Sequence, residues 1–182
     1  MSTNSGLLRA ISTIPEIGLT EITETKDGWK QSLLSGKDGN DLVTLHLGKS
    51  ELAGELLISQ SKSINQPLVK NVGEMISADT LTLGYPLFYI KEALGLKDIP
   101  MATCYALLYR SASVVLEAER LHIKTAVLVL DNASSDTAFG DYQNFAHLLK
   151  GPGQPNCFYK SQLQGRVNLY FGLFDKNLDH TH

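Results

Sequence analysis

The sequence has no long apolar segment and no excess of positive charge, and each absence argues against a class of protein. No apolar run approaches the roughly 20 residues that a membrane-spanning helix needs. The net charge is −3, which argues against a protein that coats nucleic acid electrostatically, although a local basic groove is compatible with it. The first residues, Met1–Gly6, lack the basic and apolar regions of a signal peptide. We therefore expect a cytoplasmic protein with no membrane partner.

Cysteine is scarce, and histidine is not arranged for metal binding. Cys104 and Cys157 are far apart in the sequence, so we predict two reduced thiols rather than a disulfide. The histidines lack the spacing of zinc ligands. The sequence also contains no P-loop, dinucleotide-binding fingerprint or nucleophile elbow. The sequence therefore predicts none of these kinds of site.

The composition is that of one globular domain. Of the 182 residues, 43% are hydrophobic and 19% are charged, which is enough apolar surface for a substantial core. No internal repeat and no linker divides the chain. We therefore predict a single domain over residues 1–182, with a core at about 7–174 and a tail at 175–182.

Hydrophobic periodicity predicts alternating helices and strands. The clearest helix spans Ala102–Leu121, and the continuous apolar run Ala126–Leu130 predicts a buried strand. Pro15 is expected to end an N-terminal helix. Other helices are expected over 7–14, 68–76, 81–96 and 138–149, a short strand or extended segment over 17–25, and a last strand over 167–174. This order predicts an α/β fold, a three-layer-type sandwich with a mixed central sheet flanked by helices.

The stretch Asp41–Lys62 carries the strongest chemical signal. Its apolar runs Leu42–Leu47 and Leu56–Ser59 flank a polar turn, which predicts a β-hairpin. Alternate residues of a strand share a face, so Gln60 and Lys62 are expected to point the same way. If the strands pair, Asp41 lies near both. A carboxylate, an amide oxygen and an ammonium group then converge, as in a metal-dependent phosphodiesterase.

This hairpin and the element order around it resemble the PD-(D/E)XK nuclease superfamily, whose fold is that of restriction endonucleases. The superfamily carries its motif on the second and third strands of a mixed sheet. A Gln-x-Lys motif, here Gln60-x-Lys62, resembles the Mrr-like branch of restriction nucleases. The resemblance implies hydrolysis of DNA, in restriction or phage defence, with Mg²⁺ or Mn²⁺ as cofactor.

A longer resemblance, over roughly residues 7–149, is to a little-characterised bacterial family within that superfamily. The long helix carries most of its specificity. This chain departs from the family at Gln60, where the family has Glu, and at Tyr109, where it has His. The first departure removes a negative charge from the implied metal site. The matching blocks are Ile14-Pro15-Glu16, Asn40-Asp41-Leu42, Gln60-x-Lys62 and the segment Tyr109–Arg120.

The resemblance implies a role for each residue of the metal site. Mg²⁺ prefers hard oxygen ligands, so Asp41 is implied as the principal ligand. The amide oxygen of Gln60 and the backbone carbonyl of Ser61 are implied as further ligands. Glu16 is implied as an outer or second-metal carboxylate. Lys62 is implied to hold the attacking water or to stabilise the anionic phosphate.

The sequence allows two interpretations of its helix-borne arginines. Arg110 and Arg120 are candidate phosphate contacts, but Arg120 also fits a helix-end ion-pair network with Glu117 and Glu119. Homodimerisation is expected by analogy with nucleases that cut both strands.

Two alternatives to the nuclease stay open. The first is a catalytically inactive member of the superfamily that serves as a binding or interaction module, which the acidic net charge and Gln60 favour. The second is a small-molecule enzyme on an unrelated α/β sheet, with Asp131 and Asp136 as a ligand-binding pair beyond a strand end.

Overall fold

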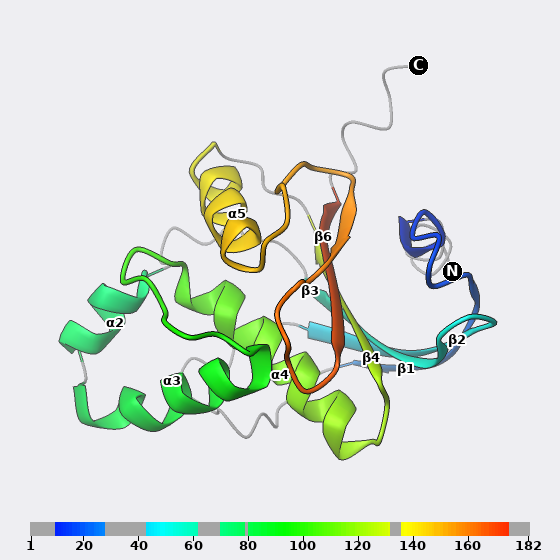
Figure 1. The fold of residues 1–182 in the computed structure, drawn as a ribbon, viewed down its shortest axis with the longest axis horizontal. Helices are drawn as coiled ribbons and strands as arrows, with labels where there is room; N and C mark the ends of the chain where they lie inside the picture. The colour runs from blue at the N-terminus through cyan, green and yellow to red at the C-terminus, as the bar shows by residue number, and fades with distance from the viewer. Residues whose placement is uncertain (1–9, 28–42, 62–69, 79, 132–135, 175–182) are drawn as a thin grey trace.

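The computed structural model describes residues 10–27, 43–61, 70–78, 80–131 and 136–174, and they form an α/β fold around one mixed six-stranded sheet (Figure 1). The strand order is β1-β2-β3-β4-β6-β5. The predicted fold class is therefore confirmed. The strands are β1 (Leu19–Asp27), β2 (Val43–Ser50), β3 (Gly54–Ser61), β4 (Thr125–Asp131), β5 (Phe158–Lys160) and β6 (Asn168–Phe174). The helices are α2 (Val72–Ala78), α3 (Thr80–Leu94), α4 (Tyr105–Arg120) and α5 (Asp136–Leu148).

The sheet is antiparallel on both sides and parallel in its centre. β2 pairs antiparallel with β1 and β3, β4 pairs parallel with β3 and β6, and β5 pairs antiparallel with β6. Parallel neighbours need long crossovers, which helices usually supply. Here α2, α3 and α4 connect β3 to β4, and α5 lies between β4 and β5. The predicted hairpin is confirmed by the pairing of β2 with β3.

The two faces of the sheet have different covers. On the helical face, α3, α4 and α5 contribute to a core with Leu57, Leu128 and Phe171. On the opposite face, which we call the N-terminal face, residues 10–17 pack on Ile58 and Tyr170. Figure 1 shows this separation, with the green and yellow helices on one side and the blue segment on the other. The described part of the N-terminal cover holds one short helical stretch, residues 10–12, so a full third layer stays a prediction.

Two helices begin later than their periodicity predicts, and the structure gives the reason. Asn71 caps α2, because its Oδ1 accepts from the Glu74 backbone N–H at 2.8 Å while the Glu74 carboxylate accepts from the Asn71 N–H at 2.9 Å. α4 begins at Tyr105 rather than Ala102, because Cys104 forms a β-bridge with Asn71. Sequence periodicity detects the apolar face of a helix but not the backbone pairing that delays its start.

Strand β5 was not predicted. It has three residues, all half-buried or exposed, so it shows no alternation long enough to detect. Its place is fixed by packing, because a Cβ on Gly172 of β6 would lie 2.7 Å from the ring of Phe158. A side chain at position 172 would therefore clash with the Phe158 ring in this position.

The composition led to expectations about the two cysteines and about membrane-spanning helices. Cys104 is a buried free thiol and Cys157 a half-buried one, as predicted. Burial raises the pKa of Cys104 to about 11, so this thiol is a poor nucleophile. Within the described ranges, no helix has the length and apolarity to cross a membrane.

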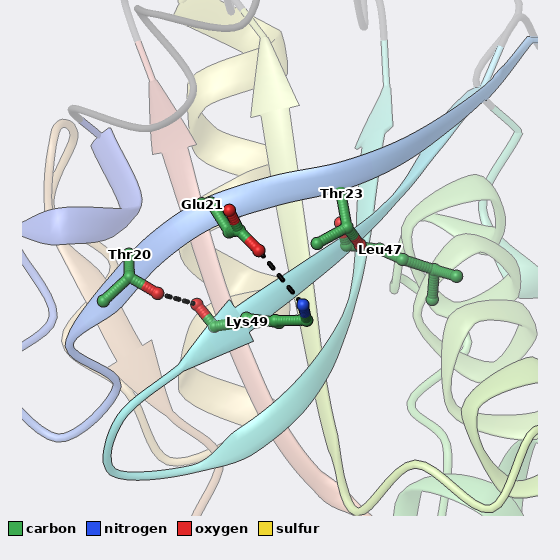
Figure 2. A network of polar contacts seen from close by, with 5 residues as sticks. All are labelled: Thr20, Glu21, Thr23, Leu47 and Lys49. Atoms are coloured by element: carbon green, nitrogen blue, oxygen red, sulfur yellow. Dashed lines mark hydrogen bonds and ion pairs between the residues drawn. The ribbon is translucent and has the colours of Figure 1, made fainter.

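Threonine side chains hold the edge strand β1 on β2 (Figure 2). The pairing has two register shifts, and Thr20 and Thr23 are the extra residues of β1 at those shifts. The hydroxyl of Thr20 donates to the Lys49 carbonyl, and that of Thr23 donates to the Leu47 carbonyl, each at 3.0 Å. Glu21 and Lys49 add an ion pair at 3.2 Å. The side chains thus replace contacts that a bulge removes from the ladder.

We predict that Thr20→Val and Thr23→Val each lower the free energy of unfolding by about 0.5–1.5 kcal/mol, the usual contribution of one hydrogen bond. Valine keeps the shape and strand preference of threonine but cannot donate. Urea denaturation measures the change. Thr20→Ser and Thr23→Ser are the controls, since they keep the hydroxyl. Valine variants as stable as the serine variants would contradict this account of the bulges.

Candidate functional site

The end of β3 and the start of β2 lie at one edge of the sheet, together with the ends of the parallel strands. Val43 of β2 pairs with Ser61 of β3, and Ser61 pairs with Leu130 of β4. Asp131 and Phe174, the last residues of β4 and β6, pair at the same edge. We call this the carboxyl edge. In open α/β sheets, ligands bind outside the carboxyl ends of the strands.

Gln60 lies one position from this edge, in a small buried polar cluster. It pairs with Thr44 of β2 and Val129 of β4. Because Ile58 lies on the N-terminal face, strand alternation places Gln60 there too. The cluster is almost fully buried, with exposed fractions of 5% for Gln60, 9% for Thr44 and 3% for His46. Each of these residues has an interaction partner. Buried polar groups with partners are held in defined orientations.

Thr44 and His46 were missed as site residues in the sequence. Strand alternation in the sequence could have indicated them. Leu45 and Leu47 pack on the helical face, so Thr44 and His46, which alternate with them, face the other way. It is unusual for one side of a strand to be both buried and polar when the other side is apolar. We call Thr44, His46 and Gln60 the polar cluster.

The structure brings together only part of the predicted metal site. Asp41 and Lys62 lie outside the described residues; in the sequence they stand two residues before Val43 and directly after Ser61. The side chain of Ser61 is 1% exposed, and its Oγ has no hydrogen-bond partner among the described atoms. Alternation puts this hydroxyl on the helical face, opposite to Gln60. The predicted ligand, the Ser61 carbonyl, stays a prediction.

Glu16 shares the N-terminal face with Gln60 but is placed beside a different residue. It is exposed and follows Pro15 in the segment that covers this face. Burial and, after it, the Glu16 carboxylate raise the pKa of Tyr170 on β6. β6 is two strands from β3, about 10 Å at the usual strand spacing. Glu16 is therefore close enough to Tyr170 to affect its pKa, and Tyr170 is two strands away from Gln60.

The two arginines lie on the helix that covers the helical face. Arg110 is 8% exposed within α4. Arg120 ends α4, and its Nε donates to Glu117 at 2.8 Å. Since β4 begins only after α4 ends, Arg120 lies at the amino edge of β4, away from Gln60. The predicted helix-end ion pairs are confirmed for Arg120 with Glu117, and Glu119 pairs with Arg166 at 3.0 Å.

A pocket of about 540 Å³ lies beside Glu16, at the β5 side of the sheet. Its walls combine aromatic rings with charges of both signs. Lys160 places its Nζ 5.7 Å from the centre of the Tyr170 ring. We call it the β5 pocket; it was not predicted from the sequence, because its walls come from four separate segments. It is lined by residues 14–16, 150–152, 158–162 and Tyr170.

The donors at the carboxyl edge suit a hard cation only in part. Among the described residues, no three His, Cys, Asp or Glu side chains are grouped closely enough to hold a metal. Gln60 offers an amide oxygen, which Mg²⁺ accepts. A carboxylate would have to come from Asp41. Asp131 ends β4 at the same edge, so the alternative pair Asp131 and Asp136 belongs to this region too.

Sequence comparison assigns the larger part of the chain to a family. Residues 65–178 match the family described as Domain of unknown function (DUF6946). The chain belongs to the DUF6946 family. No curated protein and no solved structure matches it. The DUF6946 region contains Arg110, Arg120 and most of the β5 pocket, whereas Glu16 and the hairpin that carries Gln60 precede it.

We predict that Glu16→Gln lowers the pKa of Tyr170 in this DUF6946 protein. A carboxylate beside a phenol disfavours the tyrosinate anion, so removing its charge must shift the pKa downward. Nuclear magnetic resonance of ring-labelled tyrosine during a pH titration measures the shift. Glu21→Gln is the control, because Glu21 pairs with Lys49 on the distant β1–β2 ladder. An unchanged Tyr170 titration would contradict the placement of Glu16.

Proposed function

We propose that this DUF6946 protein is a metal-dependent nuclease domain that hydrolyses phosphodiester bonds in DNA, with its site at the carboxyl edge. The supporting observation is the register of the hairpin, which pairs Thr44 with Gln60 and Val43 with Ser61. Asp41 and Lys62 flank these paired positions in the sequence. The PD-(D/E)XK resemblance implies the same arrangement of strands and motif. Restriction or phage defence, and a homodimer that cuts both strands, are further parts of this proposal.

In this proposal each residue has a chemical task. A bound Mg²⁺ or Mn²⁺ supplies an activated water and neutralises charge that develops on the phosphate. The Asp41 carboxylate and the Gln60 amide oxygen are its proposed side-chain ligands. Lys62 stabilises the anionic phosphate electrostatically. Gln60 is buried and has an interaction partner, and an amide held in one orientation lowers the cost of binding an ion.

We predict that purified protein cleaves supercoiled plasmid or single-stranded DNA with Mg²⁺ or Mn²⁺, and that Asp41→Ala and Lys62→Ala each slow cleavage at least about 100-fold. Loss of one preorganised electrostatic group typically has an effect of this size. Gel electrophoresis over time gives the rates. Asp98→Ala and Lys97→Ala are matched controls, because both residues are exposed in the loop after α3. Variants as active as wild type would refute the site.

The second candidate is a catalytically inactive binding module, and the residue that favours it is Gln60. A neutral amide at this position gives the site one negative charge less than the glutamate of the similar bacterial family. The two functions differ in whether the site still binds a divalent cation. A substitution that restores the carboxylate separates them.

We predict that Gln60→Glu strengthens Mn²⁺ binding by about tenfold or more, since a carboxylate is a far better ligand for a hard cation than an amide. Calorimetric titration measures the affinity. Without metal, the buried carboxylate should lower the melting temperature, and Mn²⁺ should restore it. Gln164→Glu, in an exposed loop, controls for the added charge. If neither wild type nor Gln60→Glu binds Mn²⁺, the inactive module is the better account.

A further inference from the structure

A thiol and two phenols lie together on the helical face, where α5 covers the β5 side of the sheet. Tyr142 of α5 belongs to the core of this face, and Tyr159 of β5 packs against that core. The ring of Tyr159 lies 6.1 Å from the ring of Phe171 on β6. Cys157 stands two residues before Tyr159, directly before β5. We call Cys157, Tyr142 and Tyr159 the thiol–phenol cluster.

The three groups of this cluster are close enough to affect one another. Burial and, next, a hydrogen bond with the Cys157 side chain raise the pKa of Tyr159. The Tyr159 oxygen also accepts from the Gln154 backbone N–H at 3.3 Å, which helps to hold the phenol in place. Burial and, after it, Tyr159 raise the pKa of Tyr142, and Cys157 makes a smaller contribution of the same sign. Both hydroxyl groups therefore lie near the Cys157 sulfur.

The Tyr142 hydroxyl lacks the partner that a buried phenol normally finds. Tyr142 is 0% exposed, and its Oη forms no hydrogen bond of good geometry with any described atom. The backbone of Leu173 lowers the pKa of Tyr142, which is the effect of a donor near Oη and not of an acceptor. The missing partner is therefore an acceptor for the hydroxyl hydrogen. A thiol sulfur is only a weak acceptor, whereas an oxygen atom bonded to that sulfur would be a good one.

Cys157 is accessible to a small reagent, and the other cysteine is not. Cys157 is half-buried, while Cys104 is only 2% exposed at the start of α4. The chain has no further cysteine. A sulfenic acid formed at Cys157 would therefore meet no accessible thiol of the same chain with which to form a disulfide.

We propose that Cys157 is a site of reversible oxidation, where a peroxide converts the thiol to a sulfenic acid whose oxygen accepts a hydrogen bond from the Tyr142 hydroxyl. The sulfur attacks one oxygen of hydrogen peroxide, so that an S–O bond forms and the O–O bond breaks. The leaving hydroxide takes the thiol proton and departs as water, and the electron pair lost by sulfur reduces the peroxide. An external thiol then condenses with the sulfenic acid to a mixed disulfide and water, and a second thiol molecule releases Cys157. This site is independent of the proposed nuclease function.

The test is oxidation of the reduced full chain with hydrogen peroxide, followed by trapping of sulfenic acid with dimedone. Peptide mass spectrometry locates the adduct, because the exposed Met101 also takes up oxygen. We expect the adduct at Cys157 and not at Cys104, and its loss when dithiothreitol is added before trapping. Tyr142→Phe is expected to speed conversion of the sulfenic to the sulfinic acid about two- to tenfold, the effect of one hydrogen bond. Tyr89→Phe, which removes the hydroxyl of an exposed tyrosine on α3, is the matched control.

Thermal unfolding distinguishes this proposal from simple exposure of the thiol. Oxidation is expected to raise the melting temperature of wild type but not of Tyr142→Phe, because only wild type gains an acceptor for the buried hydroxyl. Dithiothreitol should reverse the rise, since it does not reduce oxidised methionine. Tyr159→Phe, at a half-buried position, gives a second lifetime measurement if Tyr142→Phe does not fold. No dimedone adduct at Cys157, or a sulfenic acid that lasts as long in the phenylalanine variants as in wild type, overturns the proposal.

Discussion

The pairing of β3 with its two neighbours is the constraint on which the rest of the structure depends. β3 is antiparallel to β2 and parallel to β4, so the start of one strand and the ends of two others meet at the carboxyl edge. A shift of the β2–β3 register by one residue would move every side chain of one strand to the opposite face. Thr44 and Gln60 would then no longer lie side by side. The geometry of the polar cluster is therefore a direct consequence of the hairpin.

The polar cluster and the β5 pocket belong to different parts of the chain. The polar cluster comes from the β2–β3 hairpin, which precedes the DUF6946 region. The β5 pocket takes most of its lining from within that region and its remaining wall from residues 14–16. The sheet joins them, because strands from both parts are paired in one row from Gln60 to Phe158. A function that uses both features needs both parts of the chain.

Much of the fold was predictable because long elements carry long patterns. The apolar run of β4 and the two apolar runs that flank the polar turn of the hairpin are local signals, and the structure confirms both predictions. The pocket was not predictable, because a three-residue strand has no detectable period and because Glu16 and Tyr170, which both line the pocket, are more than 150 residues apart in the sequence. The burial of His46 was not predictable from the sequence either. Its neighbours in the sequence are leucines, and nothing in that local pattern predicts a histidine that is only 3% exposed. The assignment of Asp41 and Lys62 remains a prediction from the sequence.

The most direct test of the central claim is to locate a bound metal by nuclear magnetic resonance. Mn²⁺ broadens the amide resonances of residues close to it, so a titration of isotope-labelled protein maps its position. The account predicts saturable broadening that is strongest at Thr44, Gln60 and Leu130, that spares the hairpin turn at Leu52, and that Asp41→Ala abolishes. Broadening centred on Glu16 and Tyr170, or no saturable broadening at all, would contradict a metal site at the carboxyl edge.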